Sequence, residues 1–185
     1  MSSASVILPV LGPAPQLDRL LRALEELPST TLREVIVVDN TDPESSEVRA
    51  AVERAASGSS RTIRLIHEPK GYSYAARNAG IAAAVTEYLA FMNVDVVRES
   101  GYGHALGRLV GSGRIARFTG PVNQFVERIA PLPWDRCAQA FDLIFGLHQK
   151  TYAAGEWAAT ANLVVHRATV EEVGPFDDSL ETVRA

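Results

Sequence analysis

Two carboxylates in the sequence follow apolar runs that are typical of buried strands. Asp39 ends the run VIVVD, and Asp95 ends the run YLAFMNVD, in which Asn93 stands two positions earlier. In an open parallel sheet, ligands bind in the crevice outside the carboxyl ends of the strands. A carboxylate there can accept a hydrogen bond from a nucleoside or bind a hard cation through oxygen. The alternative is that each acid caps the turn or helix that follows it, and the spacing leaves both open.

Arg77 is a charged residue within the alanine-rich segment GYSYAARNAGIAAAV, which has the character of a helix. The small side chains allow that helix to pack closely on a sheet. A cation amid such packing needs an anionic partner, because burial of an unpaired charge is costly. An acid at the sheet edge and a phosphate group of a ligand both meet this need, and the sequence leaves the two open.

Apolar runs and helical periods alternate four times in the first half of the chain, which predicts an α/β fold with a mostly parallel central sheet flanked by helices. We find no internal repeat and no linker, so we expect one domain, 1–185, with a nucleotide-binding half at 1–98 and a second half at 99–185. The strands are expected at 5–11, 33–40, 61–68, 87–95, 114–122 and 157–167. The helices are expected at 15–27, 42–56, 72–85, 101–113, 135–152 and, followed by a turn, within 168–180.

Composition narrows the class of protein. The 185 residues are 46% hydrophobic and 22% charged, as in ordinary globular domains. A formal net charge of -4 argues against nucleic acid as a partner. The single cysteine, Cys137, excludes an internal disulfide and a cysteine-based zinc cluster. No apolar run approaches the roughly 18 residues of a membrane-spanning helix, and the amino terminus does not resemble a signal peptide. We therefore expect a cytoplasmic protein without a transmembrane segment, and homo-oligomer formation stays open.

Four segments of the first half occur in a characteristic order: SVILPV, REVIVVDN, GYSYAARNAGI and YLAFMNVDVV. Together they closely resemble the amino-terminal half of the family 2 glycosyltransferases, which have the GT-A fold. The later stretch WAATANLVVHRATVEEVGPFDDSL is similar to the acceptor-side segment of that family. The resemblance covers nearly the whole chain. It implies transfer of a sugar, with inversion, from a UDP-, GDP- or TDP-linked donor to an unknown acceptor.

The resemblance also implies which residues bind the donor. Pro9 matches the proline of the first strand, near the nucleotide, and Asp39 matches the acid that contacts the base. Arg77 matches the arginine close to the donor diphosphate. Asn93 and Asp95 occupy the two ends of the DxD motif, in which the last acid, here Asp95, holds Mg²⁺ or Mn²⁺. The first acid of the motif is replaced by an amide, which predicts a weaker affinity for the cation.

On the acceptor side, the resemblance points to Asn162. Trp157 stands next to the expected strand that contains Asn162, and its ring is suited to stacking on a sugar or to burial. An inverting transferase needs a general base, and in this family it is an acid shortly after the turn that matches 174–180. The chain ends before a matching acid, so we expect it to be cut short there. Asp177 and Asp178 are weak substitutes for the base, because they lie in the turn itself.

Two classes of function therefore remain open at this point. The first is a glycosyltransferase that depends on a nucleotide sugar and on a divalent metal. The alternative is a non-catalytic protein with a degenerate site that binds a nucleotide sugar or a partner. Asn93 and the missing base favour the alternative, whereas the intact stretches ARNAGI and TANL favour the enzyme. A dinucleotide reductase is disfavoured, since no G-x-G-x-x-G follows the first strand.

Overall fold

The computed structural model describes residues 2–113, 117–120, 122 and 158–177. The strands are β1 (Ala4–Val10), β2 (Leu32–Asp39), β3 (Thr62–His67), β4 (Tyr88–Met92), β5 (Arg117–Thr119) and β6 (Asn162–His166). The helices are α1 (Leu17–Glu25), α2 (Ser46–Gly58), α3 (Ser73–Ala83), α4 (Tyr102–Ser112) and α6 (Arg167–Val173). The helix expected at 135–152, with Cys137, lies outside the described residues. None of the helices in the described ranges has the length and apolar character needed to span a membrane.

Within the described residues, the strands form one six-stranded sheet with the order β3-β2-β1-β4-β6-β5. The first four strands are parallel to one another, whereas β6 pairs antiparallel with both β4 and β5. The prediction of a mostly parallel α/β sheet is therefore confirmed. Within the strand expected at 114–122, the described residues include β5, whereas 114–116 and 121 lie outside the described residues. The direction of β6 was not predicted.

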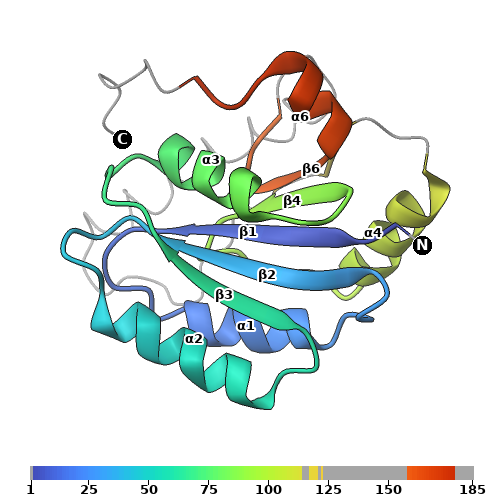
Figure 1. The fold of residues 1–185 in the computed structure, drawn as a ribbon. Coiled ribbons are helices and arrows are strands. Elements are labelled where there is room, and N and C mark those ends of the chain that lie inside the picture. The colour runs from blue at the N-terminus through green and yellow to red at the C-terminus, as the bar shows by residue number, and fades with distance from the viewer. Residues whose placement is uncertain (1, 114–116, 121, 123–157, 178–185) are drawn as a thin grey trace, which may run out of the picture.

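Helices cover both faces of the sheet (Figure 1). One face packs against α1 and α2, and α4 contributes to the same apolar core. The other face packs against α3 and α6. The pattern of α1 explains its placement, since its leucines recur at helical spacing and are all buried. These residues are Leu17, Leu20, Leu21 and Leu24.

Helix α3 lies unusually close to the centre of the sheet because it presents a glycine there. A Cβ atom added at Gly80 would lie 2.4 Å from Cγ2 of Ile7, which is fully buried in β1. The helix is otherwise built largely from alanine, so its backbone approaches the sheet along much of its length. This close approach places Arg77, one turn before Gly80, near the end of β4.

We expect Gly80→Ala to lower the free energy of unfolding by about 1–3 kcal/mol, because a methyl group inserted into a well-packed core displaces its neighbours. Gly111→Ala is a matched control, since Gly111 lies in α4 with no other atom within 4 Å of its added Cβ. That substitution should leave stability unchanged or raise it slightly through helix propensity. Urea unfolding of both variants measures the difference. Equal effects would mean that α3 does not pack tightly on β1.

Candidate functional site

The predicted site lies where the parallel strands end. Asp39, the last residue of β2, is in register with Val10 of β1 and with His67 of β3. Strand β4 ends at Met92, so Asn93 and Asp95 follow at the same edge of the sheet. The prediction that both polar segments share one edge is therefore confirmed, and it follows from the parallel arrangement of these strands.

The carboxylate of Asp39 organises the loop that follows β2. The side chain is fully buried. Its Oδ1 accepts a hydrogen bond from the backbone amide of Thr41 at 2.9 Å, and its Oδ2 accepts one from the amide of Ser45 at 2.7 Å. This is the capping role that the sequence left open. Contact with a nucleotide base remains a separate prediction for Asp39. The residue lies at the sheet edge, but its carboxylate is fully buried and both of its oxygens are already bonded, so such contact requires the loop to open.

Asn40 connects the loops that follow three strands, a role that the sequence analysis missed. Its side-chain Nδ2 donates hydrogen bonds to the carbonyl oxygens of Glu68 at 3.0 Å and Lys70 at 2.9 Å. Its backbone amide donates to the carbonyl of Val10 at 2.7 Å. An amide side chain directly after a strand was the available signal. These bonds fix the loops after β1, β2 and β3 relative to one another before any ligand binds.

Pro9 lies half-buried near the end of β1, opposite Val38 of β2. The pairing of β1 with β4 ends at Ile7 and Phe91. Pro9 lies beyond that pairing, so its missing N–H does not interrupt it. Leu11, two residues further along, is 65% exposed at the edge of the sheet.

Arg77 is a buried cation at this edge. The residue is 8% exposed, and its Nη2 donates to Oδ1 of Asn93 at 3.3 Å. Its guanidinium carbon lies 5.9 Å from the centre of the Phe176 ring. Burial lowers the pKa of Arg77 from its ordinary value, yet an arginine stays charged at neutral pH. Among the described residues, Arg77 forms no ion pair and its buried Nε has no hydrogen-bond partner.

The two polar residues of the segment after β4 differ in their exposure to solvent. Asn93 is half-buried and turned toward Arg77, whereas Asp95 is exposed. Val94 and Val96 pack against the apolar core and anchor the segment. The described part of the chain has no group of three or more His, Cys, Asp or Glu residues that could hold a metal ion. A cation at Asp95 would therefore need oxygen ligands from a bound diphosphate, an arrangement that Mg²⁺ commonly adopts.

The acceptor-side residues lie beside this segment. Asn162 begins β6, is in register with Met92, and is half-buried. Its side-chain Nδ2 lies 2.3 Å from the position that a Cβ at Gly120 would occupy, so a larger residue at position 120 would displace the Asn162 side chain. Asp177 is exposed in the turn after α6. Trp157 and Asp178 lie outside the described residues.

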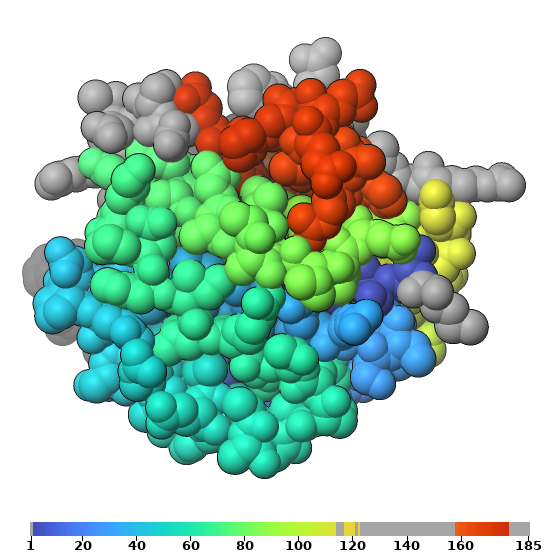
Figure 2. All heavy atoms as spheres, viewed as in Figure 1, coloured from blue at the N-terminus to red at the C-terminus, as the bar shows by residue number. Residues whose placement is uncertain are grey.

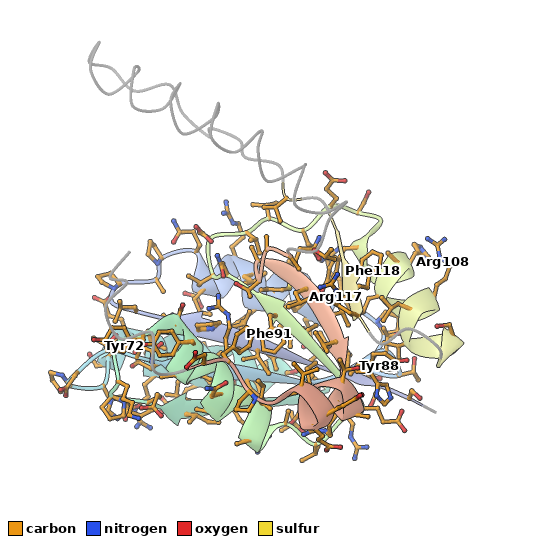
Figure 3. The ribbon with its side chains drawn as sticks, turned by 90° about the horizontal axis from the view of Figure 1, so that it is seen from above. Tyr72, Tyr88, Phe91, Arg108, Arg117 and Phe118 are labelled. Atoms are coloured by element: carbon orange, nitrogen blue, oxygen red, sulfur yellow. The ribbon has the colours of Figure 1, made fainter. Side chains whose placement is uncertain are left out.

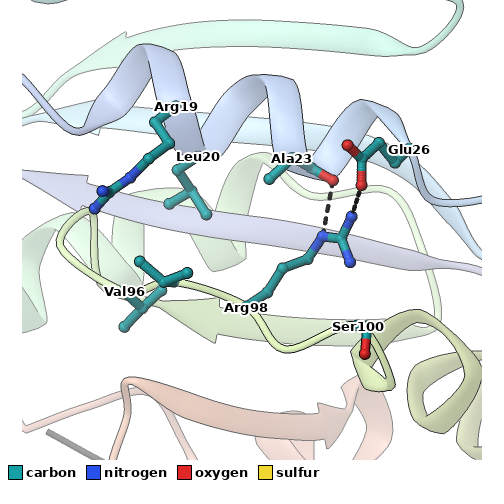
Figure 4. Close-up of a pocket in the computed structure, with 8 residues that line it drawn as sticks. Arg19, Leu20, Ala23, Glu26, Val96, Arg98 and Ser100 are labelled. Atoms are coloured by element: carbon teal, nitrogen blue, oxygen red, sulfur yellow. Dashed lines mark hydrogen bonds and ion pairs between the residues drawn. The ribbon is translucent and has the colours of Figure 1, made fainter. Parts of the chain in front are cut away.

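A separate pocket of about 270 Å³ lies between α1 and residues 96–100 (Figure 4). The Nε of Arg98 donates to the carbonyl of Ala23 at 2.9 Å, and its Nη2 forms an ion pair with Glu26. The side chain of Arg98 thereby ties the segment that follows Asp95 to α1. The pocket does not include the polar residues at the ends of the parallel strands, and Arg98 in its lining is already paired with Glu26.

Comparisons with known proteins agree with this fold. The model of the family described as glycosyl transferase family 2 matches residues 5–102. A search of the curated proteins finds no match. The sheet, its covering helices and this match define a GT-A-type domain. The chain belongs to glycosyl transferase family 2.

Solved glycosyltransferase structures are similar to the chain. A mannosyltransferase from Pyrobaculum calidifontis in complex with GDP-Man and Mn²⁺ has a TM-score of 0.68 at 18% identity, over 94% of this chain and 47% of that one. Glucosyl-3-phosphoglycerate synthase from Mycobacterium tuberculosis, in complex with Mn²⁺, UDP-glucose and glycerol 3-phosphate, has a TM-score of 0.57 at 14% identity, over 90% and 57% of the two chains. The present chain thus spans about half the length of these structures, and at such identities the likeness concerns the fold.

Proposed function

We propose that the chain is the nucleotide-sugar-binding part of a glycosyltransferase that moves a sugar from a nucleoside diphosphate to an acceptor hydroxyl. The observation that carries this proposal is Arg77, a buried cation whose described polar contact is the neutral amide of Asn93. A buried charge without a counter-ion is costly, and an anionic ligand at the sheet edge would remove that cost. A diphosphate has the charge and the oxygen atoms that a guanidinium recognises best.

The residues of the chain would then act in defined ways. Arg77 donates hydrogen bonds to the diphosphate, whose negative charge grows as its bond to the sugar breaks. Asp39 is proposed for the side of the base, and Pro9 for a position near the nucleotide. The residues fit a divalent cation, Mg²⁺ or Mn²⁺, held by Asp95 together with the diphosphate, and when bound it supplies further neutralisation of the leaving group.

Inversion would follow from direct displacement at the anomeric carbon. The acceptor oxygen forms a bond to that carbon while the bond to the diphosphate breaks, and the hydroxyl proton passes to a general base. Asn162 and Trp157 are proposed for the acceptor side. Asp177 is an exposed acid in the described turn, and Asp178 follows it in the sequence; both remain weak candidates for the base.

Donor binding tests the proposal by titration calorimetry with UDP, GDP and TDP, each with and without Mn²⁺. At least one of them should bind, and Mn²⁺ should tighten the binding. Asp95→Ala should remove the increase that Mn²⁺ causes, because it deletes the carboxylate ligand, and should leave the metal-free affinity nearly unchanged. Asp18 on α1, a partly exposed acid that pairs with Arg54, provides the control Asp18→Ala, which should behave like the wild type.

Flat titrations with all three nucleotides would contradict the transferase and also the alternative, a binding protein without catalysis. The alternative is favoured by Asn93, whose amide contacts Arg77 and supplies no charge to a cation. Mass spectrometry of products, with a panel of nucleotide sugars and simple acceptors, tests for transfer. Product would support the transferase, whereas binding without product fits both the alternative and a transferase part that lacks its general base.

A further inference from the structure

The side chain of Asn78 binds both polar groups of the Phe176 backbone. Its Nδ2 donates to the carbonyl of Phe176 at 2.9 Å, and its Oδ1 accepts from the amide of Phe176 at 2.9 Å. The two residues are 98 positions apart in the sequence. A primary amide that is paired in this way with one residue fixes both the position and the orientation of that residue, because the two bonds differ in direction.

This pairing joins the donor half of the chain to the acceptor half. Asn78 lies in α3, immediately after Arg77 in sequence, whereas Phe176 lies in the turn after α6. In the space-filling view, the surface of residues 158–177 lies directly against that of α3 (Figure 2). Amide–backbone bonds at this contact therefore connect the helix that carries the buried cation to a segment of the acceptor side.

The Phe176 ring lies between the apolar core and the cation. It contacts the ring of Phe91 edge to face, with the centroids 5.4 Å apart and an angle of 90° between the planes. Phe91 projects from β4 in the interior of the molecule (Figure 3). The guanidinium of Arg77 lies 5.9 Å from the centre of the Phe176 ring, within the range of a cation–π contact. Phe176 thus covers Arg77 with an aromatic surface in place of water.

Other contacts hold α6, so its attachment does not depend on Asn78. The side chain of Arg167 donates from Nε to the carbonyl of Thr86 at 2.9 Å and from Nη2 to the carbonyl of Ala84 at 2.6 Å. The amide of Gly174 closes the helix on the carbonyl of Val170 at 2.8 Å. The Asn78 amide therefore acts on the end of the turn, where the Phe176 ring meets Arg77.

We propose that Asn78 is a positioning residue, which holds the Phe176 ring over Arg77 and so keeps the guanidinium dehydrated and directed at the donor diphosphate. The role in donor binding rests on the proposed function. A cation that is shielded from water attracts an anion more strongly, since the effective dielectric constant around it is lower. A fixed ring also spares the site the reorganisation that a mobile ring would require when the ligand binds.

A double-mutant cycle tests whether Asn78 acts through Phe176. The dissociation constants of UDP and GDP, each with Mn²⁺, are measured for the wild type, Asn78→Ala, Phe176→Leu and the double variant. Each single substitution should weaken binding by about 3- to 30-fold, the size of a partly desolvated cation–π contact. The double variant should bind the nucleotide no more weakly than the single variant with the lower affinity. Both substitutions disrupt the same placement of the Phe176 ring over Arg77, so their effects do not add. Multiplication of the two single effects would overturn the proposal.

A second readout does not depend on a ligand. Exchange of the Arg77 Nε proton with solvent, followed by ¹⁵N NMR, should be slow in the wild type and at least about tenfold faster in Asn78→Ala and in Phe176→Leu, because a shielded group opens to water. Ala82→Ser, at an exposed position of the same helix, should leave the exchange unchanged. If the wild type binds neither nucleotide, the proposed function fails, while this exchange still decides the role of Asn78.

A conservative variant covers the case in which Asn78→Ala does not fold. Asn78→Asp keeps the acceptor for the Phe176 amide and places a second oxygen against the Phe176 carbonyl, where a donor is needed. Faster exchange of the Arg77 proton in Asn78→Asp supports the proposal. Exchange as slow as that of the wild type in Asn78→Asp or Asn78→Ala, with a normal unfolding transition, would overturn it.

Discussion

Arg77→Met is expected to weaken the binding of a nucleoside diphosphate by about 30-fold or more, while the unliganded protein becomes equally or more stable. Removal of one member of a buried charge pair at a binding site typically costs about 2–5 kcal/mol, and each 1.4 kcal/mol is about a factor of ten. In the free protein, the same change removes a buried cation that forms no ion pair among the described residues. Methionine fills a similar volume and packs well against an aromatic ring such as that of Phe176.

Titration calorimetry and thermal unfolding measure the two halves of this prediction on the same samples. Arg77→Lys should bind with intermediate affinity, because it keeps the charge and loses the planar fork of donors. Arg49→Met is the matched control, since Arg49 is an exposed arginine on α2 that pairs with Glu44. Unchanged nucleotide binding in Arg77→Met would place the diphosphate elsewhere. A large loss of stability would show that the cation is compensated in the free protein.

The order of the elements up to β4 was predictable because mostly apolar runs alternate with segments of helical periodicity. The shared edge of Asp39 and Asp95 followed from that order, since parallel strands present their carboxyl ends together. The direction of β6 was not predictable in the same way. A buried run such as NLVVH has the same composition in either direction, and only its pairing with β4 determines that it is antiparallel.

The detailed arrangement of the site depends on contacts between distant segments. Asn93 was expected to bind the nucleotide sugar from the first position of a DxD motif, and the structure adds a hydrogen bond that its amide accepts from Arg77. That contact exists because α3 lies close to the sheet, which in turn depends on Gly80. The pairing of Asn78 with Phe176 likewise has no local pattern, as 98 positions separate the two residues. Local spacing carries no information on such pairs.

The second large effect concerns stability. Arg61→Met is expected to lower the free energy of unfolding by about 3 kcal/mol, since several buried acceptors would lose their donor. The Arg61 side chain is 1% exposed and ion-paired with Glu25 at 3.1 Å. Its Nη2 donates to the carbonyls of Glu25 at 2.9 Å and Leu27 at 2.7 Å, and its Nη1 donates to that of Leu32 at 2.9 Å. It therefore closes the end of α1 and binds it to the start of β2.

Urea unfolding measures this loss against the control Arg54→Met. Arg54 forms an ion pair with Asp18 at 2.8 Å, and the two side chains are 60% and 40% exposed. An exposed pair of this kind contributes at most about 1 kcal/mol, so the control should differ little from the wild type. Because a small domain has only about 5–15 kcal/mol of stability, the loss in Arg61→Met should be visible as a clear shift of the midpoint. Equal shifts in the two variants would contradict the structural role of Arg61.

The pH dependence of the same loss supplies an independent check. Burial by itself raises the pKa of Glu25. Hydrogen bonds from Ser59, Ser60 and Arg61, together with the charge of Arg61, lower it by more than burial raises it, so that the pKa is about 2. A carboxyl group with a depressed pKa in the folded state stabilises the protein fully above its unfolded pKa, and that contribution is lost as the pH falls toward the folded value. The wild type should therefore lose this stability between about pH 4.5 and pH 2.

Arg61→Met, in which the pKa of Glu25 is less depressed, should lose less stability over that range. The gap in the free energy of unfolding between the two proteins should therefore narrow on acidification. A gap that is constant from neutral pH down to about pH 2 would mean that the Glu25 carboxylate gains nothing from Arg61, and that the backbone carbonyls alone account for the effect.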